Sequence, residues 1–150
     1  MFKISKKVIY AIEAVVDVAY YSSDKPVQNI EIAKRQGIPK RYLEQTLQSL
    51  VKENILIGSR GPKGGYRLAK ERRKIKISDI INSVDKNHEM TLKNKLMVSE
   101  ISNKILNPML TNIYKQLFIS LSKISLEEIY KKAKDEKISK ESSIKVDFVI

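Results

Sequence analysis

Residues 42–69, YLEQTLQSLVKENILIGSRGPKGGYRLA, decide the fold class of this chain. Leucines at positions 43, 47 and 50 recur at helical spacing, which predicts an amphipathic helix from about Pro39 to Lys52. The runs 55–59 and 65–69 predict two strands. The turn between them, 60–64, is too rich in glycine and too polar to pack inward. A helix, a strand, a basic glycine-rich loop and a second strand together form the layout of a winged helix.

The residues before this stretch predict the first two helices of a helix-turn-helix. Ser5 is placed to cap a helix that runs to about Tyr21, with Glu13 and Asp17 off its inward face. That face holds Val8, Ile12, Val15, Val16 and Ala19. After a turn at 22–26, Val27 can add a short edge strand, and a second helix over 29–36 places Ile30 and Ala33 inward. Gly37 fits the position after this helix and Pro39 the first position of the next, so 37–39 is the tight turn.

The residues after the wing predict a fourth helix, a linker and a long apolar helix. Ser78 is the expected cap of the fourth helix, which ends near Val84 and closes a DNA-binding domain over 1–85. A linker over 86–104 leads to a dimerisation helix and a short following helix, opened by Ser125, over 105–134. A charged tail over 135–150 ends in a strand or a frayed end at 146–150. The regular part of the long helix is expected from Asn107, with a kink in one longer helix as the alternative. The fold class is therefore mainly α with a small β-hairpin wing.

The charge of the chain is positive and unevenly distributed. The formal net charge is +12, and the pI is about 9.8. Residues 1–75 hold 16 Lys and Arg against 7 Asp and Glu, whereas residues 76–150 hold 13 against 10. The basic surplus thus coincides with the helix–wing segment, which favours double-stranded DNA as the partner. A general enrichment in lysine is the alternative.

The composition argues against several functional classes. The chain has no cysteine, which removes disulfides, thiolate metal sites and a cysteine nucleophile. The one histidine, His88, has only Glu89 beside it as a further ligand, so we expect no metal and no other cofactor. No catalytic constellation is present, which makes an enzyme a distant hypothesis. Glu13 and Asp17 interrupt the apolar N-terminal run, and no stretch reaches the roughly 18 apolar residues of a membrane span. We therefore expect a cytoplasmic protein without membrane contact.

The helix over 39–52 carries candidate base readers in its first turns, the part of such a helix that meets base edges in a major groove. Arg can pair with guanine, Gln with adenine, and Glu can accept a hydrogen bond from cytosine. Arg41, Glu44 and Gln45 are therefore the predicted readers, and Lys40 and Tyr42 are expected to hold phosphate. An ordinary solvated helix face is the alternative.

The predicted wing carries Arg60, Lys63 and Arg67 around three glycines and a proline. Glycines let the loop approach the DNA backbone closely, and a basic tip gains from the negative potential of a narrow minor groove. A plain hairpin turn is the alternative, although the helix and the wing in this order are more specific than either alone.

The apolar stripe over 105–124 is too wide for a helix that only lies on its own domain. We expect it to pack against a second copy of the chain, with an intramolecular core as the alternative. The expected dimerisation residues are Leu106, Met109, Leu110, Ile113, Leu117 and Leu121.

Five segments of the chain together resemble the Rrf-two family of bacterial winged-helix regulators, the IscR, NsrR and CymR type. They are KISKKVIYAIEAVVDVA, IAKRQGIPKRYLEQTLQSLVKENIL, GSRGPKGGYRLAK, ISDIINSVD and IYKQLFISLSKISLEEIY. The resemblance covers about residues 1–85 well and 105–131 loosely. It implies a homodimer that binds a pseudo-palindromic operator and usually represses. It also implies that Arg41 and Glu44 contact bases, that Arg60 enters the minor groove, and that Lys7 is a basic contact near the start of the first helix.

Two departures from the family pattern bear on function. Many members hold an iron–sulfur cluster through three cysteines after the fourth helix, whereas this chain has DKNHEMTLKNKLMVSE at 85–100. The chain therefore resembles the cysteine-free branch, in which a protein partner can tune repression, and a small ligand is the other candidate signal. A Gly-Arg pair common near the N-terminus is Val8-Ile9 here, which removes one phosphate contact. A rival hypothesis is a winged-helix module that docks an acidic protein and has no specific DNA target.

Overall fold

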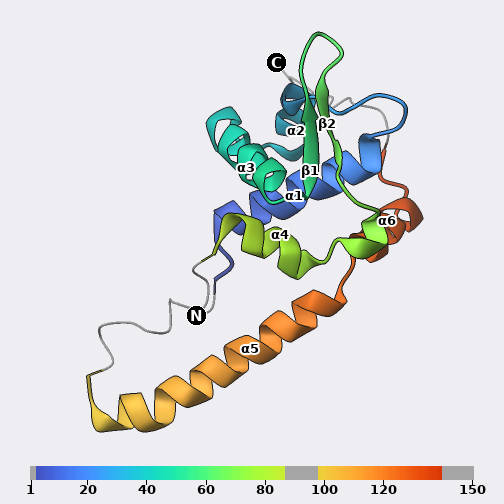
Figure 1. The fold of residues 1–150 in the computed structure, drawn as a ribbon. Coiled ribbons are helices and arrows are strands. Elements are labelled where there is room, and N and C mark those ends of the chain that lie inside the picture. The colour runs from blue at the N-terminus through green and yellow to red at the C-terminus, as the bar shows by residue number, and fades with distance from the viewer. Residues whose placement is uncertain (1–2, 87–97, 140–150) are drawn as a thin grey trace, which may run out of the picture.

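The structure is a computed structural model that describes residues 3–86 and 98–139 (Figure 1). Residues 3–86, here called the body, form a helix–wing unit, and the helical residues 100–123, here called the arm, extend away from it. The predicted class, mainly α with a small β-hairpin wing, is confirmed. In chain order the elements are α1 (Lys6–Tyr21), α2 (Asn29–Gln36), α3 (Lys40–Lys52), β1 (Leu56–Ser59), β2 (Gly65–Leu68), η1 (Arg72–Lys74), α4 (Ile77–Val84), η3 (Ser102–Leu106), α5 (Asn107–Lys123) and α6 (Leu126–Asp135).

Helix α1 lies at the centre of the body and contacts α2, α3, α4 and α6. Ser5 caps it as predicted, since its hydroxyl accepts from the Val8 N–H at 3.3 Å. The predicted inward residues are buried or half-buried in the core. Asp17 is the exception to the prediction, because it is 1% exposed instead of facing outward. It pairs with Arg35 of α2, a partner 18 residues away that the periodicity of α1 cannot reveal.

Helix α2 buries a different isoleucine from the predicted one. Ile32 is fully buried, whereas Ile30 is 63% exposed. Ala33 is half-buried, as predicted. An eight-residue helix with apolar residues at its second, fourth and fifth positions does not define one face by itself. Contact with α1 and α3 decides which isoleucine is covered.

The turn between α2 and α3 follows the glycine prediction. Gly37 ends α2 with φ 65°, a left-handed conformation, and its N–H donates to the Ala33 carbonyl. Pro39 is the residue that precedes α3, one position before the predicted one. On α3, Leu43, Leu47 and Leu50 are buried as predicted. Three residues, 37–39, therefore separate the end of α2 from the start of α3.

The wing is an antiparallel hairpin in which Leu56 lies opposite Leu68 and Ser59 opposite Gly65. Its turn requires two adjacent glycines. A Cβ on Gly64 would lie 2.4 Å from the Ser59 carbonyl oxygen, and a Cβ on Gly65 would lie 2.5 Å from that of Val27. Gly65 lies this close to Val27 because Val27, the predicted edge strand, exchanges two hydrogen bonds with Tyr66, at 3.0 and 2.7 Å. The base of the wing is thus held by the residues just before α2.

Helix α4 ends near the predicted residue but has a different cap. Lys76 is the N-cap, and its backbone N–H donates to the Asp79 carboxylate at 2.9 Å. Ser78, the predicted cap, is buried in the first turn. Asp79 acts as the acidic residue of a capping box does, three positions after the cap, so no hydroxyl is needed there.

The arm begins earlier than Asn107. Helical backbone is present from Glu100, and the π-helical segment η3 continues into α5 without a break. This matches the alternative of one longer helix, with the irregularity taken up as a π segment. Residues 100–104, assigned to the linker from the sequence, therefore belong to the arm.

The chain after the arm returns to the body. The Ile77 N–H donates to the Ile124 carbonyl at 3.0 Å, and the Leu126 N–H donates to the Ile75 carbonyl at 2.8 Å. Leu126 is fully buried. The predicted cap Ser125 accepts from the Glu128 N–H at 3.3 Å and opens α6. The arm is therefore fastened to the body at its C-terminal end.

Residues 87–97 and 140–150 lie outside the described part of the chain. His88, most of the predicted linker and the predicted strand or frayed end at 146–150 fall there. The division into domains stays a prediction.

Candidate nucleic-acid interface

The start of α3 presents the five predicted contact residues together on its outer face. Lys40, Arg41, Tyr42, Glu44 and Gln45 are all exposed. The opposite face is buried, including Thr46, whose hydroxyl donates to the Tyr42 carbonyl at 2.8 Å. Because the core fixes the buried face of α3, it also fixes the direction in which the opposite face points.

The start of α1 lies beside the start of α3. The rings of Tyr10 and Tyr42 are 6.4 Å apart between centroids. Lys7 is exposed and lies three residues before Tyr10, so the two share one side of α1. This places Lys7 on the same flank of the body as the exposed turns of α3.

An open groove of about 590 Å³ separates α3 from the wing. Gln48 and Lys52 line it from α3, and Arg60 lines it from the wing. Gln28 and Asn29 line its end at the start of α2. The Gln28 amide also donates to the Pro62 carbonyl at the wing tip, at 3.4 Å. The groove is therefore bordered by polar side chains and by the glycine backbone of the wing.

The three basic wing residues do not act as one set. Arg60 and Lys63 are exposed in and beside the turn. Arg67 is exposed as well, but its guanidinium donates to the carbonyls of Ser23 and Asp24, at 2.9 and 2.5 Å. Arg67 therefore ties β2 to the turn after α1, and the structure separates it from the other two cations.

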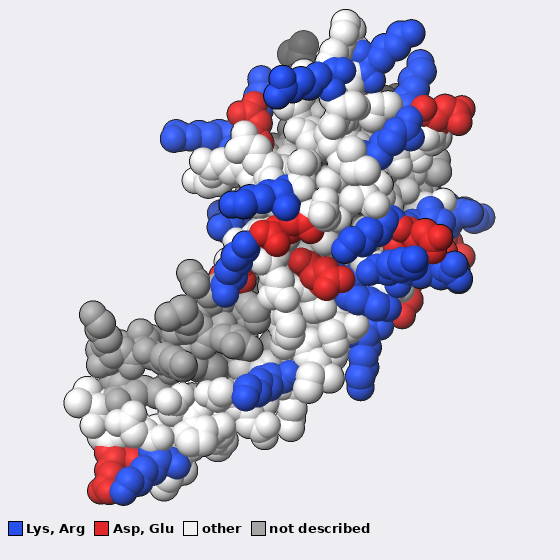
Figure 2. All heavy atoms as spheres, in the orientation of Figure 1, with Lys and Arg blue, Asp and Glu red and all other residues white. Residues whose placement is uncertain are grey.

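Charge is concentrated on the body (Figure 2). Lys and Arg side chains project around the helix–wing part of the view, whereas the long helix in the lower part is largely uncharged. The sequence of α5 holds only Lys115 and Lys123 as charged residues. The charged surface and the apolar arm are thus separate regions.

Sequence reasoning missed several polar residues that line the groove, among them Gln28, Gln48 and Lys52. Gln48 and Lys52 follow Glu44 at intervals of four residues, which was a usable signal because positions i, i+4 and i+8 share a helix face. Gln28 had no such signal, since only the fold brings it to the wing.

The residues present do not fit a cysteine-held iron–sulfur cluster. The 150 residues contain no cysteine. In the described part of the chain no three His, Asp or Glu side chains are grouped as metal ligands. None of the helices described is long and apolar enough to cross a membrane.

A helix-turn-helix followed by a β-hairpin wing, with polar and basic residues exposed on both, defines a winged helix-turn-helix protein. The family model for Rrf2, described as "Iron-dependent Transcriptional regulator", matches residues 4–132. The chain belongs to the Rrf2 family of transcriptional regulators, which is not a family of enzymes.

Similar proteins support this assignment. The HTH-type transcriptional regulator IscR of Vibrio campbellii is 40% identical over 89 residues, which cover 59% of this chain and 53% of that protein. The match thus spans about half the length of this relative. IscR of T. potens has a solved structure with a TM-score of 0.74 at 30% identity, over 92% of this chain and 93% of that one. CymR, described as the global cysteine regulator of B. subtilis, has a TM-score of 0.72 at 25% identity, over 88% and 98%.

Proposed function

We propose that the chain is a homodimeric, sequence-specific DNA-binding regulator that represses transcription in the cytoplasm. The observation that carries this proposal is the exposure of Arg41, Glu44 and Gln45 on the first turns of α3, beside a basic glycine-rich wing. A protein-docking module has no need for three side chains that can hydrogen-bond base edges on the first turns of α3. The similarity to IscR supports the same conclusion.

In this proposal α3 enters a major groove and the wing enters the neighbouring minor groove. Arg41, Glu44 and Gln45 read base edges, and Lys7, Lys40 and Tyr42 contact phosphates. Arg60 and Lys63 serve the minor groove. We assign Arg67 mainly to holding β2, because both of its carbonyl contacts lie within the body.

Dimerisation is assigned to the arm. Met109, Ile113 and Leu117 are 47–52% exposed, and Leu106 is 38% exposed. Leu110 and Leu121 are half-buried on the same helix. An exposed row of large apolar side chains on a nearly uncharged helix is typical of a surface that a partner covers. Two-fold pairing of arms would present two reading helices to the two halves of a palindromic operator.

Regulation is assigned to a signal other than a resident cluster. Iron–sulfur clusters are held by thiolates, and this chain supplies none. A small ligand, a protein partner or the abundance of the protein itself is then the signal. We expect colourless protein that binds DNA without reconstitution, even in air.

The test is selection of bound fragments from the source genome, followed by titration of a selected duplex at several salt concentrations. If six to ten phosphates are contacted, affinity should fall by roughly 10³–10⁵ between 50 and 200 mM salt. A scrambled duplex of equal length is the control. Equal affinity for both duplexes, or a flat salt response, would favour the rival protein-docking module.

A further inference from the structure

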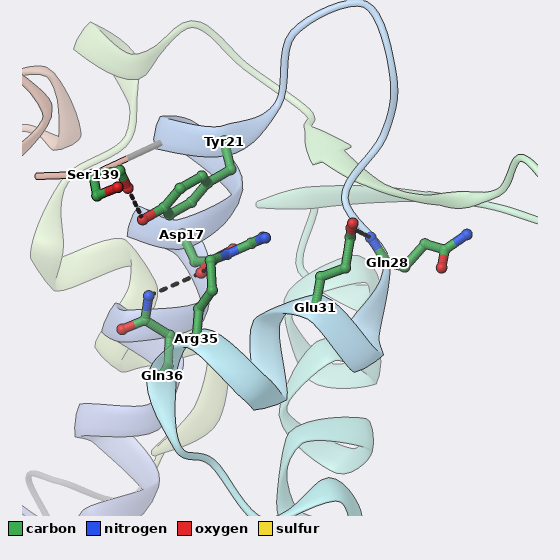
Figure 3. Close-up of polar contacts among 7 residues, drawn as sticks. All are labelled: Asp17, Tyr21, Gln28, Glu31, Arg35, Gln36 and Ser139. Atoms are coloured by element: carbon green, nitrogen blue, oxygen red, sulfur yellow. Dashed lines mark hydrogen bonds and ion pairs between the residues drawn. The ribbon is translucent and has the colours of Figure 1, made fainter. Parts of the chain in front are cut away.

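A buried ion pair joins α1 to the end of α2 (Figure 3). Arg35 donates from Nε and Nη2 to the two carboxylate oxygens of Asp17, at 2.9 and 2.8 Å, and the Gln36 amide donates to the same carboxylate at 2.8 Å. The side chain of Asp17 is 0% exposed and that of Arg35 10%. Arg35 and Gln36 are the last residues of α2, directly before Gly37. This cluster therefore ties α1 to the end of α2, just before the turn that leads into α3.

The arginine of this pair stays charged. Burial acts to lower the pKa of Arg35, but the hydrogen bond and the charge of Asp17 outweigh burial and raise the pKa above its usual value. Arg35 therefore presents a charged, two-pronged donor to the Asp17 carboxylate.

Two tyrosines connect this pair to the segment that follows α6. The guanidinium of Arg35 lies 4.0 Å from the centroid of the Tyr21 ring. The Tyr21 hydroxyl donates to the Ser139 carbonyl at 2.8 Å, as Figure 3 shows, and the Tyr20 hydroxyl donates to the Ile138 carbonyl at 2.6 Å. Burial, followed by the charge of Asp17, raises the pKa of Tyr21, so its hydroxyl remains a donor. Two neighbouring hydroxyls hold two consecutive carbonyls.

Tyr20 also contacts α6 itself. The Tyr20 ring lies 5.1 Å from the Tyr21 ring and 5.9 Å from the Tyr130 ring of α6. Arg72 lies 3.6 Å from the centroid of Tyr130, and its Nε is 2.6 Å from a carboxylate oxygen of Glu127. A continuous series of contacts therefore runs from the end of α2 through α1 to α6, which follows the arm after residues 124 and 125.

We propose that Tyr20 and Tyr21 are positioning residues for DNA recognition. By holding the carbonyls of Ile138 and Ser139, they clamp the segment after α6 onto the α1–α2 junction and so fix the start of α3. This inference rests on the proposed function in taking α3 as the reading helix. It also gives the arm a physical route to that helix. A change in the arm that displaces α6 loosens the clamp and lowers the fraction of chains in the reading geometry.

The test compares the double variant Tyr20→Phe/Tyr21→Phe with Tyr130→Phe, both in the full chain. The double variant keeps both rings and removes both hydroxyl donors. In the control, the lost hydroxyl has no hydrogen bond with any residue that the structure describes. Three quantities are measured, namely amide hydrogen exchange over residues 36–46 in the free protein, affinity for a duplex selected by the wild type and for a scrambled duplex, and the thermal midpoint.

We expect the double variant to exchange about five- to tenfold faster at the turn and the start of α3, and to bind the selected duplex about five- to tenfold more weakly. Affinity for the scrambled duplex should stay within about twofold, and Tyr130→Phe should match the wild type. Unchanged exchange at the start of α3 would overturn the proposal, as would an equal loss of affinity for both duplexes. If the wild type itself shows no sequence preference, the proposed function fails, but the exchange comparison still decides the clamp because it uses no DNA.

A double-mutant cycle tests the connection between the clamp and the buried pair. Arg35→Lys keeps the charge but loses the planar fork that matches the carboxylate. If the two act as one unit, Arg35→Lys should cost less selected-duplex affinity in the Tyr20→Phe/Tyr21→Phe background than in the wild type. Additive losses would show that they act separately and would contradict the route described above.

Discussion

The body and the arm hold similar apolar side chains in opposite environments. Leu43, Leu47 and Leu50 of α3 are at most 1% exposed, whereas Ile113 and Leu117 of α5 are 47% and 52% exposed. Both helices show apolar residues at helical spacing, but among the residues that the structure describes the apolar face of α3 is fully covered, whereas that of α5 is covered only in part. Periodicity therefore identifies an apolar face without saying which molecule covers it. Of the four predictions below, the first two test this contrast and the last two concern the body alone.

The largest effect is expected from a charge placed in the arm. Leu117→Asp should prevent pairing, because a buried unpaired carboxylate is costly. With only one half-site engaged at a time, operator affinity should fall by at least about 100-fold. Sedimentation velocity and a duplex titration measure the two effects. Gln116→Asp, which adds the same charge at a neighbouring exposed position, is the control. If the wild type sediments as a soluble monomer, the apolar stripe of the arm is not covered by a second copy, and this prediction fails.

The next largest effects are expected from two truncations to alanine, one in the body and one in the arm. Leu47→Ala should cost about 2–5 kcal/mol of unfolding free energy at every protein concentration, because it leaves a cavity in the core. Ile113→Ala should instead lower the stability in a way that depends on protein concentration, as expected for a residue covered by a second copy. Urea denaturation at two concentrations measures both. A concentration-independent loss of similar size in Ile113→Ala would mean that the stripe serves an intramolecular core.

A smaller effect, within the body alone, should separate two exposed residues of α3. Glu44→Ala should cost on the order of 1–3 kcal/mol of discrimination at one base pair in each half-site. Lys40→Ala should weaken binding to all sequences about equally, since a phosphate contact carries no sequence information. Titration against single-base-pair variants of the operator distinguishes them. A uniform loss in both variants would mean that Glu44 is not a reader.

The smallest effect concerns a polar group inside the body. The Glu13 Oε2 atom is buried without a hydrogen bond among the described residues, and burial raises the pKa of this carboxyl above its ordinary value of 4.5. Folding then disfavours the ionised form, so stability is lost as pH rises from 4.5 through the raised pKa. Glu13→Gln should therefore be more stable than the wild type at pH 7–8, by about 1 kcal/mol or less, with the gap closing below pH 4. Calorimetry at both pH values gives the difference, and a constant gap would contradict this cause.

Local patterns predicted the elements whose shape depends on neighbouring residues. The bounds of α1 and α3 and the hairpin around Gly64 and Gly65 follow within about one residue, because leucine spacing, capping and turn chemistry act over short distances. The burial of Asp17 and the choice of Ile32 over Ile30 could not be read in this way. Both depend on which residues of another helix arrive opposite them.

The candidate site shows the same division. The exposure of Arg41, Glu44 and Gln45 was predictable because the leucines of α3 occupy its buried face, and their role as base readers stays a prediction. Arg67 was assigned with Arg60 and Lys63 on composition, but its partners are carbonyls 43 and 44 residues earlier in the chain. The sequence identifies Arg67 as a cation near the wing, but only the fold shows that its guanidinium binds backbone carbonyls.

The main-chain bonds at Ile124 and Leu126, with the packing of α5 on α4, hold the arm to the body at its C-terminal part and leave its N-terminal end far from the body (Figure 1). At 1.5 Å per residue, the helix from Glu100 to Lys123 is about 35 Å long, so a tilt of about 10° at this attachment moves its far end by about 6 Å. The length of the arm couples small rotations at the body to large displacements at its far end, and the reverse also holds. Force applied far from the attachment is multiplied where the arm meets the body, and a small rotation at the attachment becomes a displacement that is a sizeable fraction of the roughly 34 Å between successive turns of DNA.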